Sequence, residues 1–198
     1  MNGPKYIIGI DEAGRGPLAG PVSIGVFAVE KKYAKKVLSR ANDSKKLSEK
    51  IREEIFSEIK VLLKEKKCFY DVSLVSEKII DTKGISFAIK KGLAKSLKKV
   101  LKEIDRMPDE VSVFLDGSLY APKEFIKQKT IIKGDSLVPV IGMASIMAKV
   151  TRDRYMVRIA KKYPQYGFEI HKGYGTLAHR KAIKKYGISN IHRKTWIK

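Results

Sequence analysis

Cysteine is nearly absent from this sequence, since Cys68 is the only one in 198 residues. One thiol cannot form an internal disulfide, and no zinc-binding pattern can be built from it. We therefore expect Cys68 to be a small buried residue rather than a nucleophile, in a protein of the reducing cytoplasm.

Long hydrophobic runs are also missing. No stretch of about 18 apolar residues occurs, so no transmembrane helix is expected. The first residues show no basic segment followed by an apolar region, which speaks against a secretion signal. Hydrophobic residues nonetheless make up 43% of the chain, enough for the core of one compact domain.

Acidic residues are scarce. Lysine and arginine total 42 against 21 aspartates and glutamates, which gives a formal net charge of +21. Such an excess indicates a polyanionic partner, most simply nucleic acid. Lysine and glutamate enrichment also marks proteins of hot environments, but that does not explain a two-to-one bias of sign.

The most informative stretch follows an apolar, β-branched run at residues 6–10, which predicts a strand. The run ends in two acids and a glycine-flanked arginine: Asp11, Glu12, Gly14, Arg15 and Gly16. Carboxylates suit Mg²⁺ or Mn²⁺, glycines let another backbone approach, and a guanidinium binds phosphate. The pattern favours a nucleic-acid phosphodiester as ligand, whereas the plainer alternative is a β-turn with solvated acids.

Two further acids follow the same logic. The apolar residues 111–115 predict a buried strand that ends in Asp116. Adjacent strands can deliver their terminal side chains to one point, so we expect Asp116 to meet Asp11 and Glu12. Asp135 precedes a predicted helix, and on spacing alone it is better interpreted as a carboxylate that interacts with the helix dipole.

The remaining pattern predicts an α/β protein. Further strands are expected at residues 22–29, 68–75 and 130–132, and helices at 48–64, 85–104, 138–154 and 178–186. Residues 163–176 are predicted to form an aromatic, glycine-rich loop in which Tyr174 is the best candidate for stacking on a base or sugar. The three histidines show no metal spacing and are interpreted as surface or packing residues. Asp153 and Arg154 are expected to be structural and ion-paired.

Several function classes lack their motifs. The spacing Gly14-x-Gly16-x-x-x-Gly20 does not fit a dinucleotide fingerprint, and neither a Walker A lysine nor a nucleophile elbow occurs. A module that only binds nucleic acid would explain the charge and Tyr174. It would not explain the acids, because acids weaken polyanion binding unless metals reverse the local charge. A metal-dependent nuclease is therefore favoured, with a resolvase-like nuclease as the alternative enzyme.

Five segments also occur in the order seen in a known family: 11–16, 43–48, 115–117, 134–154 and 172–174. On these motifs the chain resembles ribonuclease HII, the type 2 ribonuclease H family. The resemblance implies an α/β ribonuclease H-like fold, with a central mixed β-sheet flanked by helices and a helical C-terminal extension. It implies a single domain over residues 1–198, with a catalytic core at about 1–160 and a basic, aromatic substrate-binding extension at about 161–198.

The resemblance also implies an activity. The RNA strand of RNA–DNA hybrids would be cut, as would duplex DNA on the 5′ side of a single embedded ribonucleotide, leaving 3′-hydroxyl and 5′-phosphate ends. Two Mg²⁺ or Mn²⁺ ions would be held by the four acids Asp11, Glu12, Asp116 and Asp135. The substrate would be contacted by Gly14, Arg15, Gly16, Ser44, Lys45, Lys46 and Tyr174. The glycine–arginine turn would read the 2′-hydroxyl, and Tyr174 would test the next nucleotide for deoxyribose. A monomer that does not contact membranes is expected.

Overall fold

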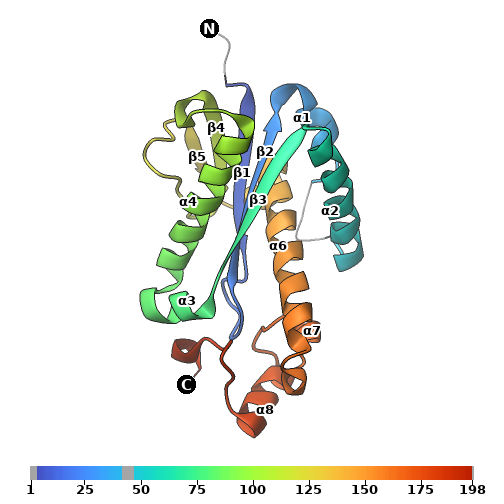
Figure 1. Ribbon diagram of the computed structural model, residues 1–198, viewed down its shortest axis with the longest axis vertical. Coiled ribbons are helices and arrows are strands. Elements are labelled where there is room, and N and C mark those ends of the chain that lie inside the picture. Colours follow the sequence, from blue (N-terminus) through green and yellow to red (C-terminus); the bar gives the residue numbers. More distant parts are fainter. Residues whose placement is uncertain (1–3, 42–46, 198) are drawn as a thin grey trace.

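The computed structural model describes residues 4–41 and 47–197. Its centre is a five-stranded sheet with the order β3-β2-β1-β4-β5 (Figure 1). The strands are β1 (Tyr6–Ala13), β2 (Val22–Glu30), β3 (Cys68–Val75), β4 (Val111–Asp116) and β5 (Gln128–Ile131). β1 is antiparallel to β2 and parallel to β4, so the sheet is mixed, as the sequence predicted.

Helices cover both faces of the sheet (Figure 1). They are α1 (Lys31–Val37), α2 (Glu49–Lys64), α3 (Glu77–Lys83), α4 (Ile85–Ile104), α5 (Gly134–Leu137), α6 (Pro139–Ala160), α7 (Phe168–His171) and α8 (Leu177–Tyr186). Short 3-10 turns occur at η1 (Pro108–Glu110), η2 (Pro164–Tyr166) and η3 (Lys194–Trp196). Within the described part of the chain, no helix is long and apolar enough to cross a membrane.

Strand alternation divides the core into two layers. Ile24, Val26 and other alternate residues of β1 and β2 pack with the apolar side of α4. Phe27 and Val29 point to the opposite face, where they pack with α6 and α2. Because successive side chains of a strand point to opposite faces, a central strand in a covered sheet is apolar throughout. All nine residues of β2 are accordingly buried.

Helix α6 lies very close to the sheet. A Cβ built on Gly9 of β1 would meet the carbonyl oxygen of Val140 at 2.0 Å, and one on Gly25 of β2 would meet that of Ala144 at 2.3 Å. Glycine is therefore required at both strand positions, and small residues on α6 complete the contact. This close approach fixes how far the side chains of α6 lie from the end of β1.

The C-terminal segment gathers at one end of α6, away from the N-terminus (Figure 1). Its core consists of Tyr166, Phe168 and Ile191 packed with Met156 of α6 and with Ala19, which precedes β2. The rings of Tyr166 and Phe168 stack with centroids 5.3 Å apart, and both are buried, so these aromatics hold the segment to the core. The last residues of the chain thus pack against its first loop.

Four details differ from the sequence prediction. β1 continues through both acids to Ala13, because its pairing with β2 extends past the end of its pairing with β4. α1 and α3 were not predicted, since a helix of seven residues has too few turns to show a period. The expected loop at 163–176 contains η2 and α7, and α6 continues to Ala160. Cys68 is buried as expected, and burial raises the pKa of its thiol to about 12.

Candidate active site

Two parallel strands bring their acids to the same end of the sheet. Ile10 of β1 pairs with Leu115 of β4, so the residues that follow, Asp11 and Asp116, lie side by side. A third element joins them, because the backbone N–H of Asp135 in α5 donates to Asp116 Oδ1 at 3.4 Å. The structure therefore brings together acids from β1, β4 and α5, as the sequence predicted for the two strands.

The acids of β1 and β4 border one pocket. Its lining residues are Asp11, Glu12, Ala13, Gly14, Arg15, Gly16, Arg52, Asp116, Ser145, Ile146, Lys149 and Tyr174. Asp135 does not line it but lies behind Asp116 with only 1% of its surface exposed. One pocket is consequently shared by the three acids, the glycine–arginine turn and the predicted stacking residue Tyr174.

The surroundings of this pocket disfavour the charged forms of Asp11 and Glu12. Burial and, after it, the neighbouring Glu12 and Asp116 raise the pKa of Asp11 to about 8, although a hydrogen bond with Ser145 acts against them. Burial also raises the pKa of Glu12, although Arg15, whose Nε donates to Glu12 Oε1 at 2.8 Å, acts in the opposite direction. Carboxylates crowded in this way are stabilised when a cation is placed among them.

The donor chemistry fits a hard divalent cation. Asp11, Glu12 and Asp116 all present carboxylate oxygens to the same pocket, and such ligands suit Mg²⁺ or Mn²⁺. Among the described residues, however, no three aspartate, glutamate, histidine or cysteine side chains are gathered tightly enough to enclose an ion. The carboxylates would have to close around a metal when it binds.

Basic and aromatic groups also line this pocket. The ring of Tyr174 is 41% exposed, with Lys149 Nζ 5.6 Å and Arg152 Cζ 5.8 Å from its centroid. Lys149 Nζ also donates to Asp153 Oδ1 at 2.9 Å. Arg154 pairs with Glu53 of α2, so Asp153 and Arg154 are ion-paired as predicted. Acids for a metal and basic groups for phosphate therefore border one pocket.

Comparison with known proteins settles the family. The ribonuclease HII family model matches residues 8–198. The chain belongs to the ribonuclease HII family. Ribonuclease HII from Ruminiclostridium cellulolyticum is 45% identical over 196 residues, which are 99% of this chain and 71% of the relative. The enzyme from Caldicellulosiruptor bescii is 43% identical over 99% of this chain and 88% of the relative.

Solved structures agree with this assignment. The ribonuclease HII in a complex with PCNA from Archaeoglobus fulgidus has a TM-score of 0.73 at 26% identity, covering 98% of this chain and 96% of that one. The ribonuclease H2 from Pyrococcus horikoshii has a TM-score of 0.72 at 27% identity, covering 96% and 93%. The chain is therefore a hydrolase and an endonuclease of the ribonuclease H type, with the predicted fold. Because the chain belongs to this family, the two alternatives, a resolvase-like nuclease and a module that only binds nucleic acid, are rejected.

Sequence reasoning missed three residues of the pocket in this ribonuclease HII: Arg52, Ser145 and Lys149. Ser145 and Lys149 are four residues apart on α6, a spacing that places them on one face of a helix. That spacing was visible in the sequence, but the side of α6 that faces the acids was not. Ser44, Lys45 and Lys46, which were predicted to contact substrate, lie outside the described residues.

Proposed function

We propose that this ribonuclease HII hydrolyses the RNA strand of RNA–DNA hybrids and also cuts duplex DNA on the 5′ side of a single embedded ribonucleotide. The products would carry 3′-hydroxyl and 5′-phosphate ends. One observation carries the proposal: the acids Asp11, Glu12 and Asp116 share a pocket with the Gly14–Gly16 turn and with Tyr174. Groups suited to holding metal, approaching ribose and stacking on a sugar thus lie within reach of one nucleotide.

Asp11, Glu12, Asp116 and Asp135 would hold two Mg²⁺ or Mn²⁺ ions. Held there, the ions would supply activation of water for in-line attack and stabilisation of the leaving 3′ oxygen. A solved ribonuclease HIII, Bst-RNase HIII, is in complex with Mn²⁺; at 18% identity and a TM-score of 0.68 its likeness to this chain concerns the fold. Support for the ions in this chain comes from the crowding that raises the pKa of Asp11 and from the hard oxygen donors around it.

The protein's own groups would orient the substrate. Gly16 is exposed, and a Cβ built on it meets no atom within 4 Å, so substrate can approach its backbone closely. Tyr174 would contact the deoxyribose next to the ribonucleotide, and Lys149 would face the phosphate beside it. Ser44, Lys45 and Lys46 would contact the nucleic-acid backbone from the segment between α1 and α2. The division near residue 160, the monomeric state and the cytoplasmic location stay predictions.

Removal of one carboxylate tests the proposal. Asp11→Asn keeps the size of the side chain but removes a metal-binding charge, so we expect cleavage of both substrates to fall at least about a thousandfold. Binding of the RNA–DNA hybrid and the melting temperature should stay close to wild type. Asp109→Asn, in the exposed η1 turn at the far end of β4, is the matched control and should cleave normally. Cleavage by Asp11→Asn at the wild-type rate would contradict the assignment.

A further inference from the structure

Two arginines are fully buried beside the glycine–arginine turn without a carboxylate in direct contact. Arg152 of α6 and Arg193, near the C-terminus, each have 0% of their surface exposed. In the described part of the chain, neither guanidinium has a carboxylate oxygen within 4.0 Å. Burying a cation without a counter-charge is costly, so its polar hydrogens need well-placed acceptors.

Arg193 finds those acceptors in the backbone of the turn. Its Nη2 donates to the carbonyl oxygen of Gly14 at 2.6 Å and its Nη1 to that of Arg15 at 2.8 Å. Its Nε donates to the carbonyl oxygen of Gly20 at 3.0 Å. Its guanidinium also lies 4.7 Å from the ring centroid of Trp196. One side chain from the end of the sequence thus fixes three peptide groups of the first loop.

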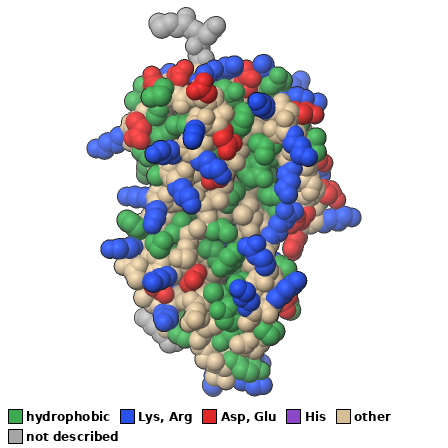
Figure 2. All heavy atoms as spheres, viewed as in Figure 1, with side chains coloured by type: hydrophobic (Ala, Val, Ile, Leu, Met, Phe, Trp, Pro, Cys, Tyr) green, Lys and Arg blue, Asp and Glu red, His purple; other side chains and the backbone are tan. Residues whose placement is uncertain are grey.

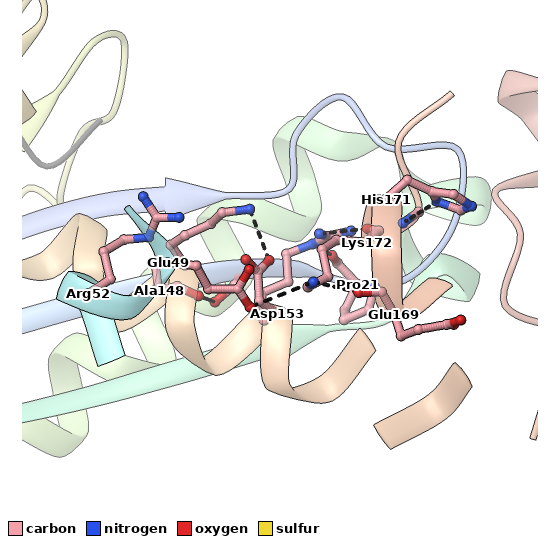
Figure 3. Close-up of polar contacts among 12 residues, drawn as sticks. Pro21, Glu49, Arg52, Ala148, Asp153, Glu169, His171 and Lys172 are labelled. Atoms are coloured by element: carbon pink, nitrogen blue, oxygen red, sulfur yellow. Dashed lines mark hydrogen bonds and ion pairs between the residues drawn. The ribbon is translucent and has the colours of Figure 1, made fainter. Parts of the chain in front are cut away.

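Arg152 holds the other end of the same loop. It donates to the carbonyl oxygens of Pro21 at 2.9 Å and of Ala19 at 3.2 Å. It also donates to that of Lys172 at 3.0 Å, two residues before Tyr174 (Figure 3). Arg152 therefore ties the first loop to the segment that carries Tyr174.

The Arg193 bonds determine where two N–H groups point. In a trans peptide unit the C=O and N–H point in opposite directions. Because the carbonyls of Gly14 and Arg15 face Arg193, the N–H groups of Arg15 and Gly16 face away from it. Within the described residues, no protein acceptor takes either N–H, and both residues line the pocket. Adjacent backbone N–H groups that both face away from a shared donor and border a pocket can bind oxygen atoms of anions and hydroxyls.

We propose that Arg193 is a positioning residue for cleavage at ribonucleotides: it holds the peptide units of Gly14 and Arg15 so that the N–H groups of Arg15 and Gly16 contact the ribose 2′-hydroxyl and the adjoining phosphate. The inference rests on the proposed function, because it assigns the discrimination of ribose to those two N–H groups. Arg193 touches no substrate and acts only through the turn. Arg152 supports the same loop and keeps it in register with Tyr174.

The test is Arg193→Lys, because an ammonium keeps the charge but lacks the planar fork that reaches three carbonyls. On duplex DNA with one ribonucleotide and Mn²⁺, we expect kcat to fall at least tenfold while KM changes less than threefold. The inhibition constant of an all-DNA duplex of the same sequence should also change less than threefold. Arg106→Lys is the matched control, since Arg106 bonds the carbonyl of Asp105 before β4 begins, far from the pocket. It should match wild type in all three quantities.

A purely structural role gives a different result. Global damage would lower the fraction of enzyme that binds the all-DNA duplex, measured as binding stoichiometry, and would lower kcat in the same proportion; that outcome, or a wild-type kcat for Arg193→Lys, overturns the inference. If Arg193→Lys does not fold, Arg193→Gln removes the cost of a buried ammonium and is assayed in the same way. Failure of both variants to fold would assign Arg193 to stability and also overturn it. If wild type does not cut at a single ribonucleotide, the proposed function fails, and the same kcat comparison is made on the long RNA–DNA hybrid.

Discussion

At the scale of single residues, the two glycines of the turn have different reasons to be glycine. Gly14 has a φ of +87°, and a Cβ there would lie 2.0 Å from Nε of Arg152. Its lack of a side chain serves contacts inside the protein. Gly16 has no such neighbour, and its backbone is outside the left-handed region. The sequence suggested one purpose for both, close approach of another backbone, and the structure leaves only Gly16 open to substrate.

Alanine should therefore lower mainly the stability at position 14 and mainly the cleavage rate at position 16. We expect Gly14→Ala to lower the free energy of unfolding by about 1–3 kcal/mol, because it combines a strained φ with a clash. Gly16→Ala should change that free energy by less than about 0.5 kcal/mol. It should nonetheless slow cleavage at a single ribonucleotide at least about tenfold, because its methyl group stands where the ribose would approach. Urea denaturation and initial rates measure the two effects. An active Gly16→Ala enzyme would show that substrate does not approach this backbone.

At the scale of elements, the C-terminal helix α8 takes part in a buried chain of hydrogen bonds. The backbone N–H of Ser189 donates to His192 Nδ1 at 2.8 Å, so the proton of the neutral ring is on Nε2. The Nε2 atoms of His192 and His179 are 3.1 Å apart, and His179 Nδ1 lies 2.9 Å from the carbonyl oxygen of Tyr174. Both rings are buried, as expected of packing residues, and they support the backbone of the predicted stacking tyrosine.

Acid should weaken this element. Burial and, after it, the neighbouring His179 lower the pKa of His192 from 6.5 to about 4. The unfolded chain therefore binds more protons between these two pH values, and the stabilisation is lost as the pH falls from 6.5 toward 4. We expect the free energy of unfolding to drop by about 2 kcal/mol between pH 7 and pH 4.5 through this group, at about 1.4 kcal/mol per pKa unit.

The His192→Gln variant isolates that contribution. Glutamine keeps an N–H donor toward His179 but does not titrate in this range. Its unfolding free energy, measured by urea denaturation at both pH values, should therefore decline less than that of wild type. Equal declines in the two proteins would show that His192 does not couple folding to pH.

Elements also show what the sequence could predict. Long amphipathic segments such as α4 and apolar strands such as β2 can be recognised from the pattern of their hydrophobic residues. The acids Asp11 and Asp116 can be predicted because each directly follows an apolar run, at the point where β1 and β4 stop pairing. What the sequence could not show are contacts between distant residues. Arg193 bonds a carbonyl 179 positions away, and no local pattern marks it. The pocket residue Arg52 depends in the same way on how α2 packs against α6.

At the scale of the whole molecule, the chain combines a large positive charge with a local concentration of acids. Lysine and arginine side chains are spread over the face shown in Figure 2, in keeping with the net charge of +21. The acids of the pocket are gathered where the parallel pairing of β1 with β4 ends. A basic surface attracts the nucleic acid, and the acids are compatible with it once cations bind among them.

The most direct measurement is to map the cut made in a labelled DNA duplex that contains one ribonucleotide, with Mg²⁺, with Mn²⁺ and with a chelator. The account predicts a cut on the 5′ side of the ribonucleotide that needs either ion, leaves a 3′-hydroxyl and disappears with the chelator. Cutting of long RNA–DNA hybrids alone would contradict the role given to the Gly14–Gly16 turn and Tyr174. Cutting that persists in the chelator would contradict the role given to the four carboxylates.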